Sequence, residues 1–118
     1  MPQSVPAPQV SVQEVSHRLQ SRAAGQDDFL ILDVREAFEL QISQLPEVTH
    51  VPLDEIFADE GRRVAELADG RDVLVLCRSG GRSDQAARIL QARGVAASNI
   101  VGGILAWSMH IDDSVPVY

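Results

Sequence analysis

The chain has 118 residues, 45% of them hydrophobic and 23% charged, which is enough for one globular domain that buries its core without disulfides or metals. Its net charge is −7 and every basic residue is arginine, and an acidic chain is a poor ligand for nucleic acids or anionic membranes. One cysteine excludes an internal disulfide, no His/Cys cluster suggests a metal site, and no apolar run approaches the ~18 residues of a membrane helix.

The N-terminus lacks the basic region followed by an apolar region that marks a signal peptide. Because a free thiol persists in reducing compartments, we expect a cytoplasmic protein. Residues 1–10 contain three prolines and no hydrophobic period, which is typical of a flexible tail or the remnant of a linker. The prediction is a tail over residues 1–10 and a single domain over residues 11–118.

The first helix is predicted to begin at Ser11, because Ser11-Val12-Gln13-Glu14 matches a capping box. Beyond Gly25, which is expected to end that helix, short apolar runs alternate with helical patterns. The expected strands are 29–34, 48–51, 73–76 and 99–101, and the expected helices are 36–41, 53–57, 61–68, 84–93 and 104–109.

This alternation predicts an α/β fold with a mainly parallel sheet covered by helices on both faces. Ligands of such sheets bind beyond the carboxyl ends of the strands. Asp33 and Cys77 stand at the ends of two apolar runs, so the sequence predicts a functional site near them.

Cys77 has two interpretations. On position alone, a cysteine after Val-Leu-Val-Leu is a small buried hydrophobe. The residues after it favour a reactive thiolate, because adjacent glycines let backbone N–H groups turn inward and the start of a helix adds positive potential. Residues 77–94 also contain four arginines against Asp84 alone, so the cysteine lies in the most basic part of an acidic chain.

The charged residues around the loop have alternatives too. Arg78 and Arg82 either orient an anionic sulfur donor or acceptor, or pair with a carboxylate beneath the loop. Asp33 and Arg35 are interpreted as support for the loop rather than as catalysts, with an ion pair from Asp33 or Glu36 to an arginine. The three histidines have no motif context and are interpreted as surface or packing residues.

Four motifs in order resemble the rhodanese-like sulfurtransferase family, over nearly the whole chain after residue 10. They are Leu32-Asp33-Val34-Arg35-Glu36, the stretch from Leu45-Pro46 to Val51-Pro52-Leu53, Cys77-Arg78-Ser79-Gly80-Gly81-Arg82, and Gly102-Gly103-Ile104-Leu105-Ala106-Trp107. The loop and the ending Pro116-Val117-Tyr118 are most similar to the rhodanese-like domain of the adenylyltransferase–sulfurtransferases of molybdopterin and thiamine biosynthesis. One departure is Glu47, which replaces a glycine suited to a turn with positive φ.

The resemblance implies a three-layer fold with about five strands and catalysis through a Cys77 persulfide. Cys77 would take a sulfane sulfur from thiosulfate or a persulfide donor and pass it to a nucleophile, which could be cyanide or a sulfur-carrier protein. It implies no metal and no organic cofactor. Substrate binding would fall to the five residues after the cysteine: Arg78, Ser79, Gly80, Gly81 and Arg82.

Two rival functions stay open. A Cys-dependent phosphatase or arsenate reductase needs an arginine six residues after the cysteine, whereas here Arg82 is the fifth and Ser83 the sixth. A non-catalytic or regulatory binding module is the alternative from another class, because a fold by itself does not establish an activity.

Overall fold

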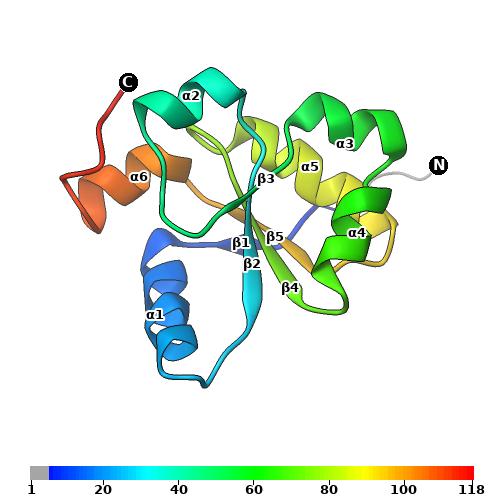
Figure 1. Cartoon of the computed structure of the whole chain (residues 1–118), viewed down its shortest axis with the longest axis horizontal. Helices are drawn as coiled ribbons and strands as arrows, with labels where there is room; N and C mark the ends of the chain where they lie inside the picture. Colours follow the sequence, from blue (N-terminus) through cyan, green and yellow to red (C-terminus); the bar gives the residue numbers. More distant parts are fainter. Residues whose placement is uncertain (1–5) are drawn as a thin grey trace.

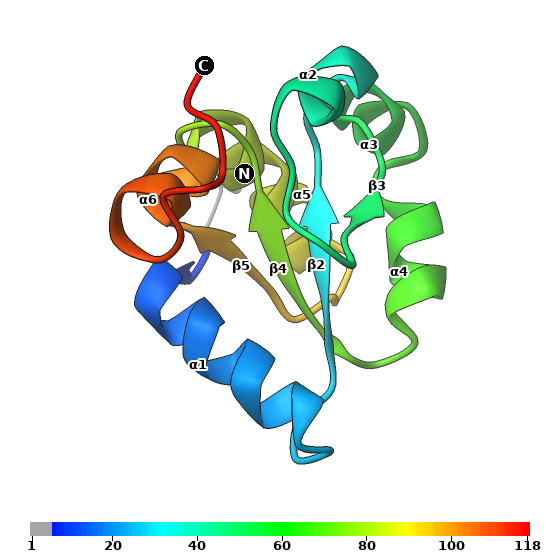
Figure 2. The same ribbon diagram turned by 60° about the vertical axis from the view of Figure 1, so that its left-hand side comes forward.

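The computed structural model describes residues 6–118, in which five parallel strands form one sheet in the order β1-β5-β4-β2-β3 (Figures 1 and 2). The strands are β1 (Gln9–Val10), β2 (Phe29–Asp33), β3 (Thr49–His50), β4 (Asp72–Leu76) and β5 (Ala97–Ile100). The helices are α1 (Val12–Ala23), α2 (Ala37–Ile42), α3 (Leu53–Asp59), α4 (Arg62–Ala68), α5 (Gly81–Ala92) and α6 (Gly103–His110).

Helices cover both faces of the sheet, so the predicted three-layer α/β architecture is confirmed (Figure 2). Successive residues of a strand point to opposite faces, and in β4 both faces are buried. Val73 and Val75 join the apolar cluster beneath α3, α4 and α5, whereas Leu74 and Leu76 join the cluster beneath α1 and α6. This double burial explains why the central strands are continuous apolar runs.

The predicted elements are found with small shifts at their ends. The capping box is present, since Ser11 Oγ accepts from the Glu14 N–H and the Glu14 carboxylate accepts from the Ser11 N–H, both at 3.1 Å. Trp107 packs in the core, with 7% of its surface exposed. Among residues 6–118, no helix has the length and apolar character needed to span a membrane.

The predicted tail differs from the structure at its end. Gln9 and Val10 form strand β1, which pairs in parallel with Asn99 and Ile100 of β5, and Ala7 before them is buried. A two-residue edge strand is too short to show an alternating pattern, so no local signal indicates it. The remainder of that prediction, over residues 1–5, lies outside the described residues.

Three local features refine the predictions made from the sequence. Helix α5 begins at Gly81 and not at Asp84, so Arg82 and Ser83 stand in its first turn and not in the loop. Of the two adjacent glycines only Gly80 has a positive φ, of 117°. Glu47, which stands where the resembled family has a glycine, adopts the left-handed conformation with φ of 58°, a conformation that favours glycine.

Candidate active site

Cys77 lies directly after β4, which is flanked in the sheet by β5 and β2. The backbone of the loop is fixed by the start of α6, where the N–H groups of Ile104 and Leu105 donate to the carbonyl oxygens of Cys77 and Arg78 at 2.9 and 3.1 Å. Gly103 makes this approach possible, because a Cβ atom there would overlap both carbonyl oxygens. The Gly-Gly pair of the last motif therefore holds the cysteine loop against α6.

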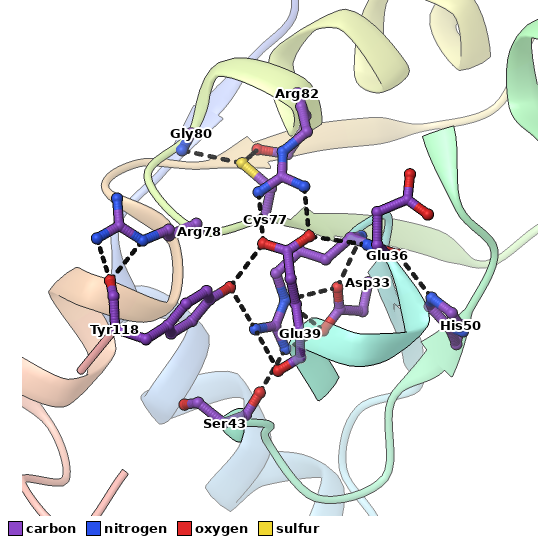
Figure 3. Close-up of polar contacts among 12 residues, drawn as sticks. Asp33, Glu36, Glu39, Ser43, His50, Cys77, Arg78, Gly80, Arg82 and Tyr118 are labelled. Atoms are coloured by element: carbon purple, nitrogen blue, oxygen red, sulfur yellow. Dashed lines mark hydrogen bonds and ion pairs between the residues drawn. The ribbon is translucent and has the colours of Figure 1, made fainter. Parts of the chain in front are cut away.

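The sulfur of Cys77 lies beside two polar groups despite its burial. The residue is only 1% exposed and its side chain faces the core under α5. The Gly80 N–H donates to Sγ at 3.0 Å (Figure 3). Ser83 Oγ lies 3.2 Å from Sγ. Gly80 is the N-cap residue of α5 and Ser83 stands in its first turn, and the N-terminus of this helix adds positive potential.

Arg82 is held by a carboxylate that no sequence motif indicates. Its two terminal nitrogens donate to Glu39 of α2 at 2.6 and 2.9 Å, a bidentate pair (Figure 3). The hydrogen bonds from Arg82 lower the pKa of Glu39 from 4.5 to about 2, and the same pair raises the pKa of Arg82. Glu36, one of the predicted partners, instead caps α2 together with Glu39.

Asp33 and Arg35 form a wholly buried ion pair, with Nη2 and Oδ2 2.8 Å apart. Arg35 also donates to the carbonyl oxygen of Ser43 at 2.8 Å and to the hydroxyl of Tyr118 at 2.7 Å. That hydroxyl donates in turn to Glu39 at 2.9 Å. A continuous set of hydrogen bonds therefore runs from the end of β2 through Tyr118 and Glu39 to Arg82 (Figure 3).

Arg78 points to the C-terminal segment rather than to the sulfur. Its guanidinium donates to the carbonyl oxygen of Tyr118 and lies 5.2 Å from the centre of the Tyr118 ring. Ser79 and Gly81 are exposed, while Gly80 is partly buried. The structure thus brings Cys77, Gly80 and Ser83 into contact. Arg82 is engaged by Glu39 of α2, and Arg78 by the C-terminal segment.

Glu39 and Tyr118 were missed because each touches the loop only through the fold, across 43 and 40 residues of sequence respectively. The only sequence signal for Glu39 was its place three residues after Glu36, the spacing of a capping box. His50 is a packing residue, with its ring nitrogen 2.7 Å from the carbonyl oxygen of Arg35.

Comparisons with known proteins give a consistent assignment. The family model described as rhodanese-like domain matches residues 11–110. The adenylyltransferase and sulfurtransferase MOCS3 of Aedes aegypti is 38% identical over 122 residues, covering 96% of this chain and 26% of that protein. A protein named sulfurtransferase from Allochromatium vinosum is 35% identical over 96 residues, covering 80% of this chain and 86% of that protein.

Among solved structures, the thiosulfate sulfurtransferase of Pseudomonas aeruginosa superposes with a TM-score of 0.73 at 29% identity. The match covers 87% of this chain and 19% of that one. The chain thus spans about a quarter of the MOCS3 relative and most of the Allochromatium protein.

Proposed function

Because the chain belongs to the rhodanese-like family, we propose that it is a sulfurtransferase that uses Cys77 as its nucleophile. The observation that carries this proposal is the environment of Sγ, which receives the Gly80 N–H at 3.0 Å and faces the N-terminal turn of α5. Fixed N–H groups and a helix N-terminus stabilise a thiolate or the terminal sulfur of a persulfide.

The proposed reaction has two displacements at sulfur. In the first, the Cys77 thiolate attacks the outer sulfur of thiosulfate, the S–S bond of the donor breaks, and sulfite leaves with the bonding electrons. In the second, an acceptor nucleophile attacks the outer sulfur of the Cys77 persulfide, and the Cys77 thiolate leaves. Cys77 is a thiolate before and after the cycle, and the sulfur moves from donor to acceptor as a sulfane sulfur, so no outside oxidant or reductant is needed.

Substrate binding is proposed for the residues after the cysteine, namely Arg78, Ser79, Gly80, Gly81 and Arg82. A guanidinium carries five N–H donors, and Glu39 takes two of those of Arg82. Arg82 therefore has donors left to orient an anionic sulfur donor while Glu39 holds it in place. The structural and functional interpretations of this arginine are compatible.

The natural donor or acceptor is proposed to be a protein. The MOCS3 relative combines an adenylyltransferase with a sulfurtransferase in one chain, which suggests a protein sulfur donor or a sulfur-carrier protein as the partner here. We propose the cytoplasm as its compartment, because the mechanism needs a reduced thiol.

Mass spectrometry of the intact chain tests the proposal. After incubation with thiosulfate, or with glutathione persulfide as a second donor, the chain should gain the mass of one sulfur, and a later addition of cyanide should remove it. Because Cys77 is the only cysteine, Cys77→Ser is the matched control and should gain nothing. A folded protein that takes sulfur from neither donor would be a binding module, and hydrolysis of a chromogenic phosphate ester that is lost in Cys77→Ser would favour the phosphatase alternative.

Arg82 is tested in the same assay. Arg82→Ala should slow loading from thiosulfate more than loading from glutathione persulfide, and it should lower thermal stability because Glu39 loses its partner. If stability falls but the folded fraction loads from thiosulfate at the normal rate, Arg82 has only a structural role.

A further inference from the structure

A second set of polar residues reaches the sulfur through Ser83. Ser83 Oγ, wholly buried, lies 3.2 Å from Cys77 Sγ and 2.5 Å from Asn99 Oδ1 of β5. Asn99 Nδ2 donates to Gln9 Oε1 of β1 at 2.8 Å. Gln9 Nε2 donates to Asp84 Oδ1 at 3.0 Å and to the carbonyl oxygen of Ala7 at 3.1 Å.

Asp84 and the Ala7 carbonyl, the acceptors farthest from the sulfur, determine the direction of every hydrogen bond in this set. An ionised carboxylate and a backbone carbonyl only accept, so Asp84 and Ala7 together require Gln9 to turn its NH₂ group outward. The Gln9 oxygen then faces Asn99 and requires the Asn99 NH₂ group. Asn99 consequently turns its oxygen, an acceptor only, towards Ser83.

The Ser83 hydroxyl has one proton and two neighbours that could accept it. The 2.5 Å contact to Asn99 Oδ1 is at the short end of the range for O–H···O bonds, and Asn99 is 4% exposed, so water does not easily replace this donor. Leaving a buried oxygen without a donor is costly. In this arrangement the Ser83 hydroxyl therefore donates its hydrogen bond to Asn99 Oδ1, and a lone pair of Ser83 Oγ faces the sulfur.

We propose that Ser83, Asn99 and Gln9 control the proton on Cys77: the set holds the resting cysteine as a thiol whose S–H donates to Ser83 Oγ. When the sulfur becomes a thiolate or a persulfide anion, the Ser83 hydroxyl rotates and donates to it instead of to Asn99. Ser83 touches the reacting sulfur, whereas Asn99 and Gln9 are positioning residues that act through it. The resting arrangement of Ser83 favours the thiol form of Cys77, whereas the Gly80 N–H favours the anionic form whichever way Ser83 is turned.

Three arginines around Cys77 are paired with carboxylates: Arg82 with Glu39, Arg35 with Asp33, and Arg88 with Asp84. Arg78 donates to the uncharged Tyr118 carbonyl oxygen and keeps its positive charge, which is the same in the wild type and in a Gln9 variant. Gln9 is exposed at the edge strand, so replacing it changes no charge near the sulfur. It is thus the one member of the set that can be altered without disturbing either the loop or the core.

The test is the pH dependence of Cys77 alkylation by iodoacetamide, checked by the ultraviolet absorbance of the thiolate. In Gln9→Met the Asn99 amide is free to turn its NH₂ group to Ser83, and the hydroxyl then donates to the sulfur. The midpoint of the profile should move to lower pH by about one unit, the size of one hydrogen bond to an anion. Gln9→Ala should do the same, and Gln13→Met, at an exposed glutamine of α1, should leave the profile unchanged.

A double variant tests whether Gln9 acts on Cys77 through Ser83. In a Ser83→Ala background, Gln9→Met should have no further effect on the midpoint, because the hydroxyl through which it acts is gone. An unchanged or higher midpoint in Gln9→Met, or a shift that persists without Ser83, overturns the inference. The inference concerns the nucleophile of the proposed function, but alkylation needs no sulfur donor, so a chain that never takes up sulfur would contradict that function alone.

Discussion

The pair between Glu39 and Arg82 makes the strongest prediction about stability and pH. Glu39 is 7% exposed at its side chain and accepts two hydrogen bonds from Arg82, which is 35% exposed. Glu39→Gln keeps the size of the side chain but removes its charge and one of its acceptors. We expect this variant to be less stable than the wild type at neutral pH.

The magnitude is set by the pKa of Glu39, which falls from 4.5 to about 2 in the folded protein. At about 1.4 kcal/mol for each pH unit, this shift corresponds to roughly 3 kcal/mol; the hydrogen bonds from Arg82 are its largest cause, and those from the Glu36 N–H and the Tyr118 hydroxyl add to it. Because a third of the Arg82 side chain meets water, we expect about 2 kcal/mol to be measured. The pKa is depressed, so this stability is complete above pH 4.5 and is lost progressively as the pH falls towards 2.

Urea unfolding at several pH values measures the effect. The free energy of unfolding of Glu39→Gln should lie about 2 kcal/mol below that of the wild type at pH 7, and the two should converge on acidification below pH 4.5. The control is Glu55→Gln, which breaks an exposed pair with Arg63 and should cost well under 1 kcal/mol. A Glu39→Gln loss no larger than that of the control, or one that does not change with acid, would refute the reasoning.

Three further substitutions test other features. Glu47→Gly should raise the free energy of unfolding by about 0.5–1 kcal/mol, because it relieves a left-handed φ of 58° at an exposed side chain; an equal or lower denaturation midpoint would count against this. Tyr118→Phe removes the hydroxyl that joins Arg35 to Glu39 and should cost about 1–3 kcal/mol by the same assay, while an unchanged midpoint would mean that water replaces the hydroxyl. Gly103→Ala should abolish a stable fold as judged by circular dichroism, because its Cβ would overlap the cysteine loop, whereas Gly25→Ala, with a similar φ but open space around it, should fold and lose only about 1 kcal/mol.

Most of the fold could be predicted from the sequence because its central elements carry strong local signals. The runs that became β2 and β4 are buried on both faces, so their central residues are all apolar and the pattern is unambiguous. The first helix is marked by the capping box at Ser11. The position of Cys77 at the carboxyl end of β4 could be inferred from these elements and from the parallel order of the strands.

The contacts around the loop were harder to predict because they join distant segments. β1 is two residues long and owes its place to pairing with β5 rather than to its own pattern. Its Gln9 side chain reaches Asn99, a partner that no spacing rule connects to it across 90 residues. The same holds for Tyr118, whose contacts with Arg35 and Arg78 exist only once the C-terminal segment lies across the carboxyl edge of the sheet.

The arginines near Cys77 show how contacts between distant segments change the expected environment of its sulfur. From the sequence, the excess of arginine after Cys77 was a physical reason for a thiolate. In the structure, however, Arg82 is paired with Glu39 and Arg88 with Asp84, whereas Arg78 is turned to the Tyr118 carbonyl oxygen, so part of that charge is balanced by carboxylates and the rest is directed away from the sulfur. The groups that act on the sulfur at contact distance are instead the Gly80 N–H and the Ser83 hydroxyl. Both are fixed by the start of α5, so we expect the reactivity of Cys77 to depend more on the geometry of that helix start than on the number of cations near it.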